Sequence, residues 1–258
     1  MKYIIKKLLT LILTLFFISV LVFLIFQVIP GDPALSILGT EATEEQVEAL
    51  REQLGLNDSM PERYFNWFTG VLTGDLGRSY RYQESLNEQM EVSRLIAGKL
   101  PVTLTLAGLS LLLIIIFSIP IGILWGGTKS RFIDGALNVL SQFTMSVPSF
   151  FLGIIIIYLF GLIMRWFTPG GYISYKEDFR GYIRYMLFPA ITVALPKAAM
   201  TAKFLRNSII TQLKSDYVRT AYSKGARRMR VLFVHVLRNA MIPVVTFIGV
   251  IAAVIAAG

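Results

Sequence analysis

Apolar residues are gathered into five blocks, and polar segments separate the blocks along the chain. The blocks are Leu8–Ile29, Leu100–Trp125, Val139–Met164, about Tyr185–Leu205, and Ala240–Gly258. Each block is long enough to cross roughly 30 Å of hydrocarbon as a helix that rises 1.5 Å per residue. Inside lipid the backbone must satisfy its own hydrogen bonds, which leaves helices as the expected structure. The pattern therefore predicts an all-α integral membrane protein with five transmembrane helices.

Composition agrees with a membrane protein. Hydrophobic residues make up 55% of the 258 residues and charged residues 16%, whereas soluble domains average about 45–50% and about 25%. A cytosolic enzyme, a disordered chain and a fibrous protein are therefore excluded. The first block exceeds the usual 7–15 residues of a signal-peptide core, and no small-x-small cleavage site precedes Pro30. We therefore interpret the first block as a membrane helix.

The distribution of charge predicts the orientation of the chain. The N-terminus carries Lys2, Lys6 and Lys7, and the segment 197–238 has ten basic residues against one acidic residue. The segment 31–99 has twelve acidic residues against six basic residues, a net charge of −6. Basic loops remain in the cytoplasm, so the N-terminus and 197–238 are predicted inside and 31–99 outside. The formal net charge of +9 is then a signal of membrane topology, and nucleic acid is not an expected partner.

This organisation predicts an N-terminal transmembrane helix over 1–30, an extracytoplasmic acidic segment over 31–99, and a core transmembrane domain over 100–258 with cytoplasmic helices near 214–238. The acidic segment contains a capping box at Thr43–Gln46, which predicts a helix that ends at Gly55. A second helix is expected after Pro61, with aromatic residues on one face. That face packs on the rest of the segment, rests at the lipid interface, or docks an outside partner. The Pro-Gly-Asp-Pro sequence at 30–33 is expected to end the first helix in a turn.

The most informative cytoplasmic stretch runs from Asp216 to Arg228. It predicts a short amphipathic helix that breaks at Gly225, followed by a second helix from about Arg227 into Pro243. The small residues Ala221 and Gly225 allow another surface to approach closely. The basic side chains could pair with acidic groups on that surface or with anionic lipid head groups. Positive-inside charge explains the bases, but it does not explain two short helices with small residues at their junction.

The residues Arg219, Thr220, Ala221, Lys224 and Gly225 form an Arg-Thr-Ala-x-x-Lys-Gly sequence. It resembles the E-A-A-x-x-x-G loop in permease subunits of ABC importers of the dipeptide, oligopeptide and nickel group, with Arg219 and Thr220 in place of Glu and Ala. Further stretches that resemble this family are 8–34, 74–79, 146–150 and 235–243. The resemblance covers essentially the whole chain, in the same order. The family has a sixth span and a cytoplasmic tail beyond the point where this chain stops at Gly258, so we expect a truncated chain or a missing sixth helix.

The resemblance implies a type I ABC importer permease fold with an extracytoplasmic helical insertion, in the bacterial inner membrane. It also implies a second homologous permease, two ATPases that hold ATP and Mg, and an extracytoplasmic solute-binding protein. The residues expected to contact the ATPase are Tyr217, Arg219, Thr220, Ala221, Lys224 and Gly225. No cofactor is expected in this chain, because Gly126–Ser130 departs from the P-loop pattern at Thr128 and Ile123.

Polar residues within the apolar blocks are candidates for the translocation path: Gln142, Ser146, Ser149 and Lys197. A lysine in a span suggests function, because exposing it to lipid costs about 2.5–3.5 kcal/mol on insertion scales. Alternatively, Lys197 lies near a kink with its amine reaching water, and the polar residues of the third block bond to neighbouring helices.

Other chemistries receive little support from the sequence. With no cysteine and only His235, disulfides, thiolate metal sites and histidine-rich metal sites are excluded; His235 is expected to be structural. A membrane enzyme would need catalytic acids in its spans, and the five blocks contain no Asp or Glu. An envelope assembly factor would not need the broken cytoplasmic helix. The family resemblance therefore implies a non-enzymatic permease for peptides; the alternatives are a permease for nickel or a metal chelate, and a non-transport membrane assembly protein.

Overall fold

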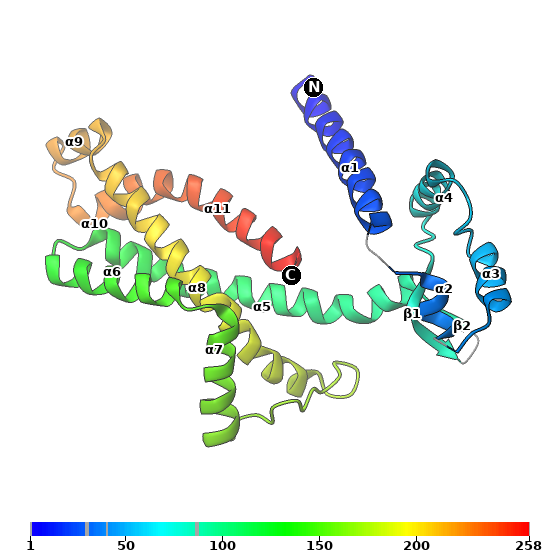
Figure 1. The fold of residues 1–258 in the computed structure, drawn as a ribbon. Coiled ribbons are helices and arrows are strands. Elements are labelled where there is room, and N and C mark those ends of the chain that lie inside the picture. Colours follow the sequence, from blue (N-terminus) through cyan, green and yellow to red (C-terminus); the bar gives the residue numbers. More distant parts are fainter. Residues whose placement is uncertain (1, 29–30, 40, 86–87, 258) are drawn as a thin grey trace. The chain divides into compact units, whose positions relative to one another are not determined.

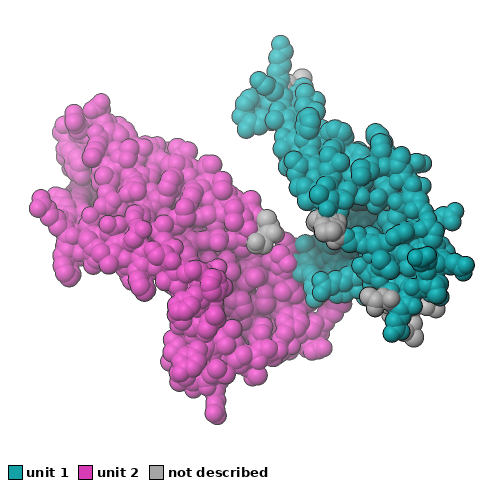
Figure 2. Space-filling view, viewed as in Figure 1, with its two compact units in different colours: residues 1–100 teal, residues 101–258 magenta. Residues whose placement is uncertain are grey.

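The structure is a computed structural model that describes residues 2–28, 31–39, 41–85 and 88–257. It forms two compact units, Met1–Leu100 and Pro101–Gly258 (Figure 2). The predicted block ends at Ile29 and Gly258, and the Pro30 turn position, lie outside the described residues.

The first unit consists mainly of helices (Figure 1). The helices are α1 (Lys2–Val28), α2 (Pro33–Leu38), α3 (Glu44–Gln53) and α4 (Met60–Thr73). Two antiparallel strands follow, β1 (Arg78–Ser85) and β2 (Glu88–Glu91), with Arg78 opposite Glu91. The expected helical insertion is thus present in α2, α3 and α4, and the two strands are an addition that the sequence analysis did not predict. Gly74 and Gly77 both have positive φ and turn the chain out of α4, and the tyrosines of β1 favour an extended strand.

The predicted start and end of α3 are confirmed. The Thr43 hydroxyl accepts from the amide of Gln46 (3.4 Å), and the Gln46 side chain accepts from the amide of Thr43 (3.0 Å). Gly55 has φ +66°, the left-handed conformation expected after α3. Asp32, predicted only as part of the turn after the first helix, also joins α2 to α3. Its carboxylate caps α2 by accepting a hydrogen bond from the amide of Ala34 (2.9 Å), and it accepts another from Nε of Arg51 on α3 (2.8 Å).

The second unit contains the remaining helices, and α5 begins in the first unit. They are α5 (Val92–Gly127), α6 (Arg131–Ser146), α7 (Ser149–Ile156), η1 (Ile157–Ile163), α8 (Phe179–Leu213), α9 (Asp216–Ser223), α10 (Arg228–Arg230), η2 (Val231–Val236) and α11 (Leu237–Ala257). Among the described residues, four helices are long and apolar enough to cross a membrane: Lys2–Val28, Val92–Gly127, Phe179–Leu213 and Arg228–Ala256.

The third predicted span, Val139–Met164, is divided at Pro148, where the sequence favours a bend. It consists of α6 and the α7–η1 pair, which meet at an angle of 94°. Pro148 lacks an amide hydrogen and disfavours helical backbone at Val147, which has ψ 121°. The two pieces count as a fifth span only when they are taken together.

Small residues bring α5 and α8 close together. Going along α5, Ser110 donates to the carbonyl of Ala190 (3.4 Å), and Gly122 lies against Ala202 and Leu205. Gly126 lies against Ile209. We call this contact the α5–α8 seam. Because residue numbers rise together on both helices, α5 and α8 run parallel, so the chain between them must return across the unit through α6, α7 and η1.

A second core lies where α8, α9, η2 and α11 meet. Its buried members are Leu205, Ile209, Val218, Val231, Leu232, Val236, Ala240 and Val244. We call these residues the η2 cluster. Apolar side chains from four elements fill this core, so the cluster joins the end of α8 to the start of α11.

Candidate functional site: the α9 helix and its supports

The helix α9 contains the predicted coupling sequence, and its ends are well defined. It follows directly on α8, with Lys214 and Ser215 between the two helices. Gly225 has φ +78°, and the amide of Ala226 donates to the carbonyl of Ala221 (3.1 Å). This is the left-handed ending that glycine permits at little cost. The break predicted at Gly225 is therefore confirmed.

The two faces of α9 differ in their surroundings. Val218 is only 1% exposed and belongs to the η2 cluster, and Ala221 packs against the same cluster. The remaining predicted coupling residues are exposed: Tyr217, Arg219, Thr220, Lys224 and Gly225. The structure thus places Ala221 on the inner face, where its small side chain permits close packing within this chain. The other five form one accessible surface, which we call the α9 outer face.

The α9 outer face is basic and has few internal ties. Arg219 lies 3.5 Å from Asp216 of the same helix, with both side chains largely exposed; such pairs stabilise little. The Tyr217 hydroxyl donates to the side-chain oxygen of Gln212 (2.8 Å). No described atom lies within 4 Å of the Cβ position that a side chain at Gly225 would have. This surface is therefore free to meet another molecule.

The chain beyond α9 is tied to the end of α5. The Arg228 guanidinium donates to the carbonyl of Gly127, the last residue of α5. Leu232 of η2 lies where a Cβ at Gly127 would reach, 2.9 Å away. The π-helix η2 then leads into α11, as expected for a second helix running to Pro243. Supports from α5, α8 and α11 therefore fix the position of α9.

A charged cluster joins α5, α6 and α8, and the sequence analysis missed it. The Asp134 carboxylate accepts from Nε1 of Trp125 (2.7 Å) and from Nε and Nη2 of Arg206 (2.9 and 2.6 Å). The Arg206 guanidinium also lies 5.3 Å from the centre of the Trp125 ring. The sequence analysis uses Arg206 only as part of the positive charge that predicts orientation. The sequence feature that could have indicated this cluster is an acidic residue just before the third apolar block and a basic residue just after the fourth.

The predicted path residues do not form one site. Lys203 donates to the side-chain oxygen of Gln142 (3.0 Å), and Ser146 donates to the backbone carbonyl of Gln142 (2.8 Å). Ser149 begins α7 on the other side of the Pro148 corner. Lys197 lies half-buried in the middle of α8, and its ammonium group has no hydrogen bond or ion pair to the residues that the structure describes.

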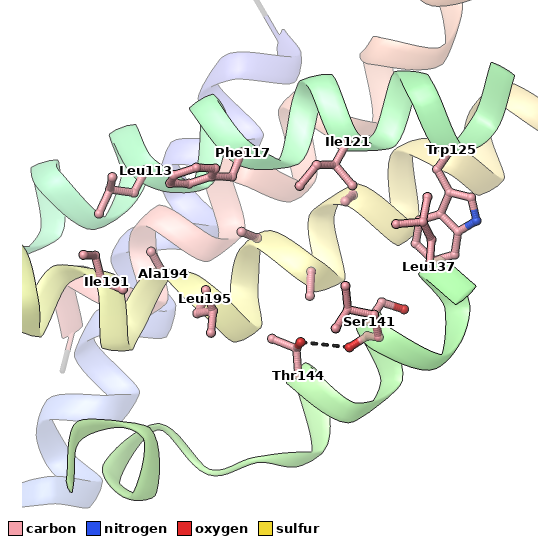
Figure 3. Close-up of a pocket in the computed structure, with 14 residues that line it drawn as sticks. Leu113, Phe117, Ile121, Trp125, Leu137, Ser141, Thr144, Ile191, Ala194 and Leu195 are labelled. Atoms are coloured by element: carbon pink, nitrogen blue, oxygen red, sulfur yellow. Dashed lines mark hydrogen bonds between the residues drawn. The ribbon is translucent and has the colours of Figure 1, made fainter. Parts of the chain in front are cut away.

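An apolar cavity of about 370 Å³ lies between α5, α6 and α8 (Figure 3). The two hydroxyls that line it bond to their own helix: Ser141 donates to the carbonyl of Asn138 (3.0 Å) and Thr144 to that of Leu140 (2.8 Å). The predicted path residues are not among its lining residues. The cavity therefore suits apolar contacts and offers no group that would hold a charged solute.

Metal binding receives no support from the described ranges, where no group of three His, Cys, Asp or Glu residues is close enough to hold an ion. His235 lies half-buried in η2, and its backbone carbonyl accepts from the Asn239 side chain (3.4 Å).

Comparison with known families decides the class of protein. Residues 118–258 match the family described as the binding-protein-dependent transport system inner membrane component, and residues 1–107 match the N-terminal region of such membrane components. The chain belongs to this family. Its members are permeases, so the chain is a permease subunit of a binding-protein-dependent ABC transporter. Membership implies a solute-binding protein and ATPases as partners.

Individual relatives match nearly the whole length of this chain. A probable peptide ABC transporter permease protein of Sinorhizobium fredii is 34% identical over 248 residues, which are 96% of this chain and 77% of the relative. A putative peptide permease protein of Brucella suis is 33% identical over 254 residues, 96% and 78% of the two chains. The glutathione transport system permease protein GsiC of Escherichia coli is 35% identical over 249 residues, 96% and 77% of the two chains.

Proposed function

We propose that this permease forms one half of the translocation path of an ATP-driven peptide importer. A second homologous permease supplies the other half, two ATPases bind on the cytoplasmic side, and a solute-binding protein delivers the peptide outside. The N-terminus and α9 face the cytoplasm. The charge distribution of the segments supports this orientation, as does the parallel course of α5 and α8, which takes both helices from the acidic side to the basic side.

The observation that carries the coupling proposal is the two-sided environment of α9. Its outer face is accessible, while Val218 and Ala221 anchor its inner face on the η2 cluster. Because that cluster contains side chains of α8 and α11, a displacement of α9 is passed to two spans. ATP shifts the balance of inward-facing and outward-facing states only as far as the ATPases hold α9 differently in the two states.

Peptides are the proposed solute because relatives at 33–34% identity are named as peptide permeases. The relative named for glutathione fits the same class, since glutathione is a tripeptide. Purification of the assembled transporter with its binding protein, followed by mass spectrometry of the released solute, tests the assignment. A peptide is the expected result, and a metal chelate would contradict it.

Two matched glycines allow a sharp test of the α9 contact. Gly225 and Gly170 have nearly the same φ, +78° and +77°, and neither has described atoms within 4 Å of a Cβ position. Asparagine tolerates this conformation better than other residues with a side chain. Gly225→Asn therefore adds bulk on the α9 outer face with little strain, and Gly170→Asn makes the same change in the segment between η1 and α8.

We expect Gly225→Asn to lose co-purifying ATPase and transport, while Gly170→Asn retains the ATPase. Expression and thermal stability should match in the two variants. The proposal fails if Gly225→Asn retains both ATPase and transport, or if both variants lose the ATPase equally.

The orientation has its own test, because the chain contains no cysteine. Single cysteines at Ser223 on α9 and at Glu45 on α3 are labelled in intact cells with a membrane-impermeant maleimide. We expect labelling at position 45 only, and labelling at position 223 would overturn the orientation.

A further inference from the structure

The helix α4 has an apolar face wider than its contact with the rest of the first unit. At helical spacing, Tyr64, Phe68 and Trp67 occupy the centre of this face, and Phe65 and Leu72 lie along one flank. Tyr64 is 8% exposed, whereas Phe65 is 61% and Leu72 is 70% exposed. The centre of the face is thus covered and its flank is open.

The helix that covers the centre is α1, the most apolar span of the chain. The Tyr64 ring lies 5.4 Å from that of Phe23, and the Phe68 ring lies 6.0 Å from that of Phe16. The hydroxyls of Ser19 and Tyr64 are 2.9 Å apart. Ser19 also donates to the carbonyl of Phe16 (2.7 Å), so Tyr64 is the donor to Ser19. Both hydroxyls are satisfied without water.

These contacts lie deep along α1. The apolar run of α1 extends from Leu8 to Val28, which is close to the length that hydrocarbon requires. Ser19 lies nine residues before Val28, and so about 14 Å from that end of the helix at 1.5 Å per residue. A helix that contacts Phe16, Ser19 and Phe23 therefore lies at the depth of acyl chains.

The polar groups of α4 are compatible with such a position. Thr69 donates to the carbonyl of Phe65 (2.8 Å) and Thr73 to that of Thr69 (3.1 Å), so these hydroxyls need no water. The charged residues Glu62 and Arg63 lie in the first turn, where the chain enters the helix. Asn66 lies on the side of the helix opposite to the apolar face.

We infer that α4 is inserted in the membrane leaflet on the side where α1 ends at Val28, with Phe65 and Leu72 against phospholipid acyl chains. The partner that fits is lipid, because the open flank belongs to a helix that packs on α1, and the apolar side chains of α1 are themselves mostly exposed. Amphipathic helices bury such a face among head groups and acyl chains. This inference depends on α1 crossing the bilayer, and it does not depend on the solute, the ATPase contact or the direction of insertion.

Single cysteines test the inference in the full chain, reconstituted in vesicles of phosphatidylethanolamine and phosphatidylglycerol. Phe65→Cys and Leu72→Cys probe the open flank, and Asn66→Cys is the matched control one residue away. Leu21→Cys, on the exposed surface of α1, is the reference for lipid. Each cysteine is labelled with a small environment-sensitive fluorophore. Its emission is then quenched either by lipids with a nitroxide on the acyl chain or by aqueous iodide.

We expect positions 65 and 72 to behave like position 21, with nitroxide quenching at least about twofold stronger than at position 66. Iodide should quench position 66 preferentially. The inference is overturned if iodide reaches 65 and 72 as readily as 66, which would place α4 in water. It is also overturned if both quenchers fail at 65 and 72, because a protein surface would then cover the flank.

Discussion

Replacing Gly122 by alanine should destabilise the permease through the α5–α8 seam. A Cβ at this position would lie 2.9 Å from Cβ of Leu205 and 3.0 Å from the carbonyl oxygen of Ala202. Both atoms belong to the rigid part of α8, so rotation of a flexible side chain cannot relieve both contacts. Carbon atoms pack at about 3.5–4.0 Å, so the two helices would have to separate locally by about 0.6 Å or more.

The expected cost is that of overpacking, about 1–3 kcal/mol, which corresponds to about a 5- to 150-fold change in the folding equilibrium. Alanine also favours helices over glycine by about 1 kcal/mol, which would hide part of this cost. Gly108→Ala is the matched control, because Gly108 lies on the same helix with no described atom within 4 Å of its Cβ position. The difference between the two variants isolates the steric part.

The assay is thermal unfolding of the detergent-solubilised full chain, followed by tryptophan fluorescence and by monodisperse elution. We expect Gly122→Ala to unfold several degrees below Gly108→Ala. Gly126→Ala should resemble Gly122→Ala, since its Cβ would lie 2.9 Å from Cβ of Ile209 and β-branched side chains adjust poorly. Equal midpoints for the 108 and 122 variants would refute the close approach of α5 and α8.

Three further predictions concern charged groups. The Asp134→Ala variant should destabilise the chain by about 1–3 kcal/mol, because it removes the hydrogen-bond acceptor of both Trp125 and Arg206. Asp134→Asn should keep the fluorescence emission wavelength of Trp125, whereas Asp134→Ala should shift it; an unshifted emission in Asp134→Ala would contradict the hydrogen bond from Trp125. The hydrogen bond from Arg51 holds the pKa of Asp32 below its usual value, partly opposed by burial, so Asp32 stabilises the first unit above the unfolded pKa of about 3.9 and loses this effect as pH falls through the folded pKa. At pH 6 the segment 31–99 should therefore be better protected from proteolysis in wild type than in Asp32→Asn. The two proteins should become equally protected under more acidic conditions, and a difference that does not depend on pH would contradict the role of the charge. The Lys197→Met variant should insert and fold at least as well as wild type, since it removes from a span a charge that has no partner among the described residues. If Lys197 lines the path, this variant should also take up acidic peptides more slowly; unchanged uptake would indicate a lysine whose amine only reaches water.

Much of the architecture follows from local patterns. The long apolar blocks predict α1, α5, α8 and α11 because a span of about twenty apolar residues has no other stable structure in lipid. The capping box at Thr43 and the break at Gly225 depend only on neighbouring residues, so they too were predicted correctly. Pro148 favours a bend in the third block, but the hydrophobic pattern does not predict the angle of 94°, because that angle depends on how the two pieces pack against α8.

The features that the sequence did not predict depend on residues far apart in the chain. Asp134 and Arg206 are separated by 72 positions, and nothing near either residue identifies the other. The strands β1 and β2 were missed because most of their residues are polar and show no clear alternation with apolar residues. The spacing of small residues was visible in Gly122 and Gly126, yet the partner helix could not be recognised without the parallel course of α8.

The same helix, α8, contributes to both the seam and the proposed coupling site, and this has a mechanical consequence. Leu205 and Ile209 contact Gly122 and Gly126 on one side and belong to the η2 cluster on the other. Force applied at α9 through Val218 therefore meets a helix that is closely packed against α5 near its own C-terminal end. Packed interiors resist compression, so α5 and α8 are expected to move together as one body when α9 is displaced. The bent α6–α7 pair also packs against α8, and we expect any change in the angle between its two pieces to occur at Pro148, where the helix is broken.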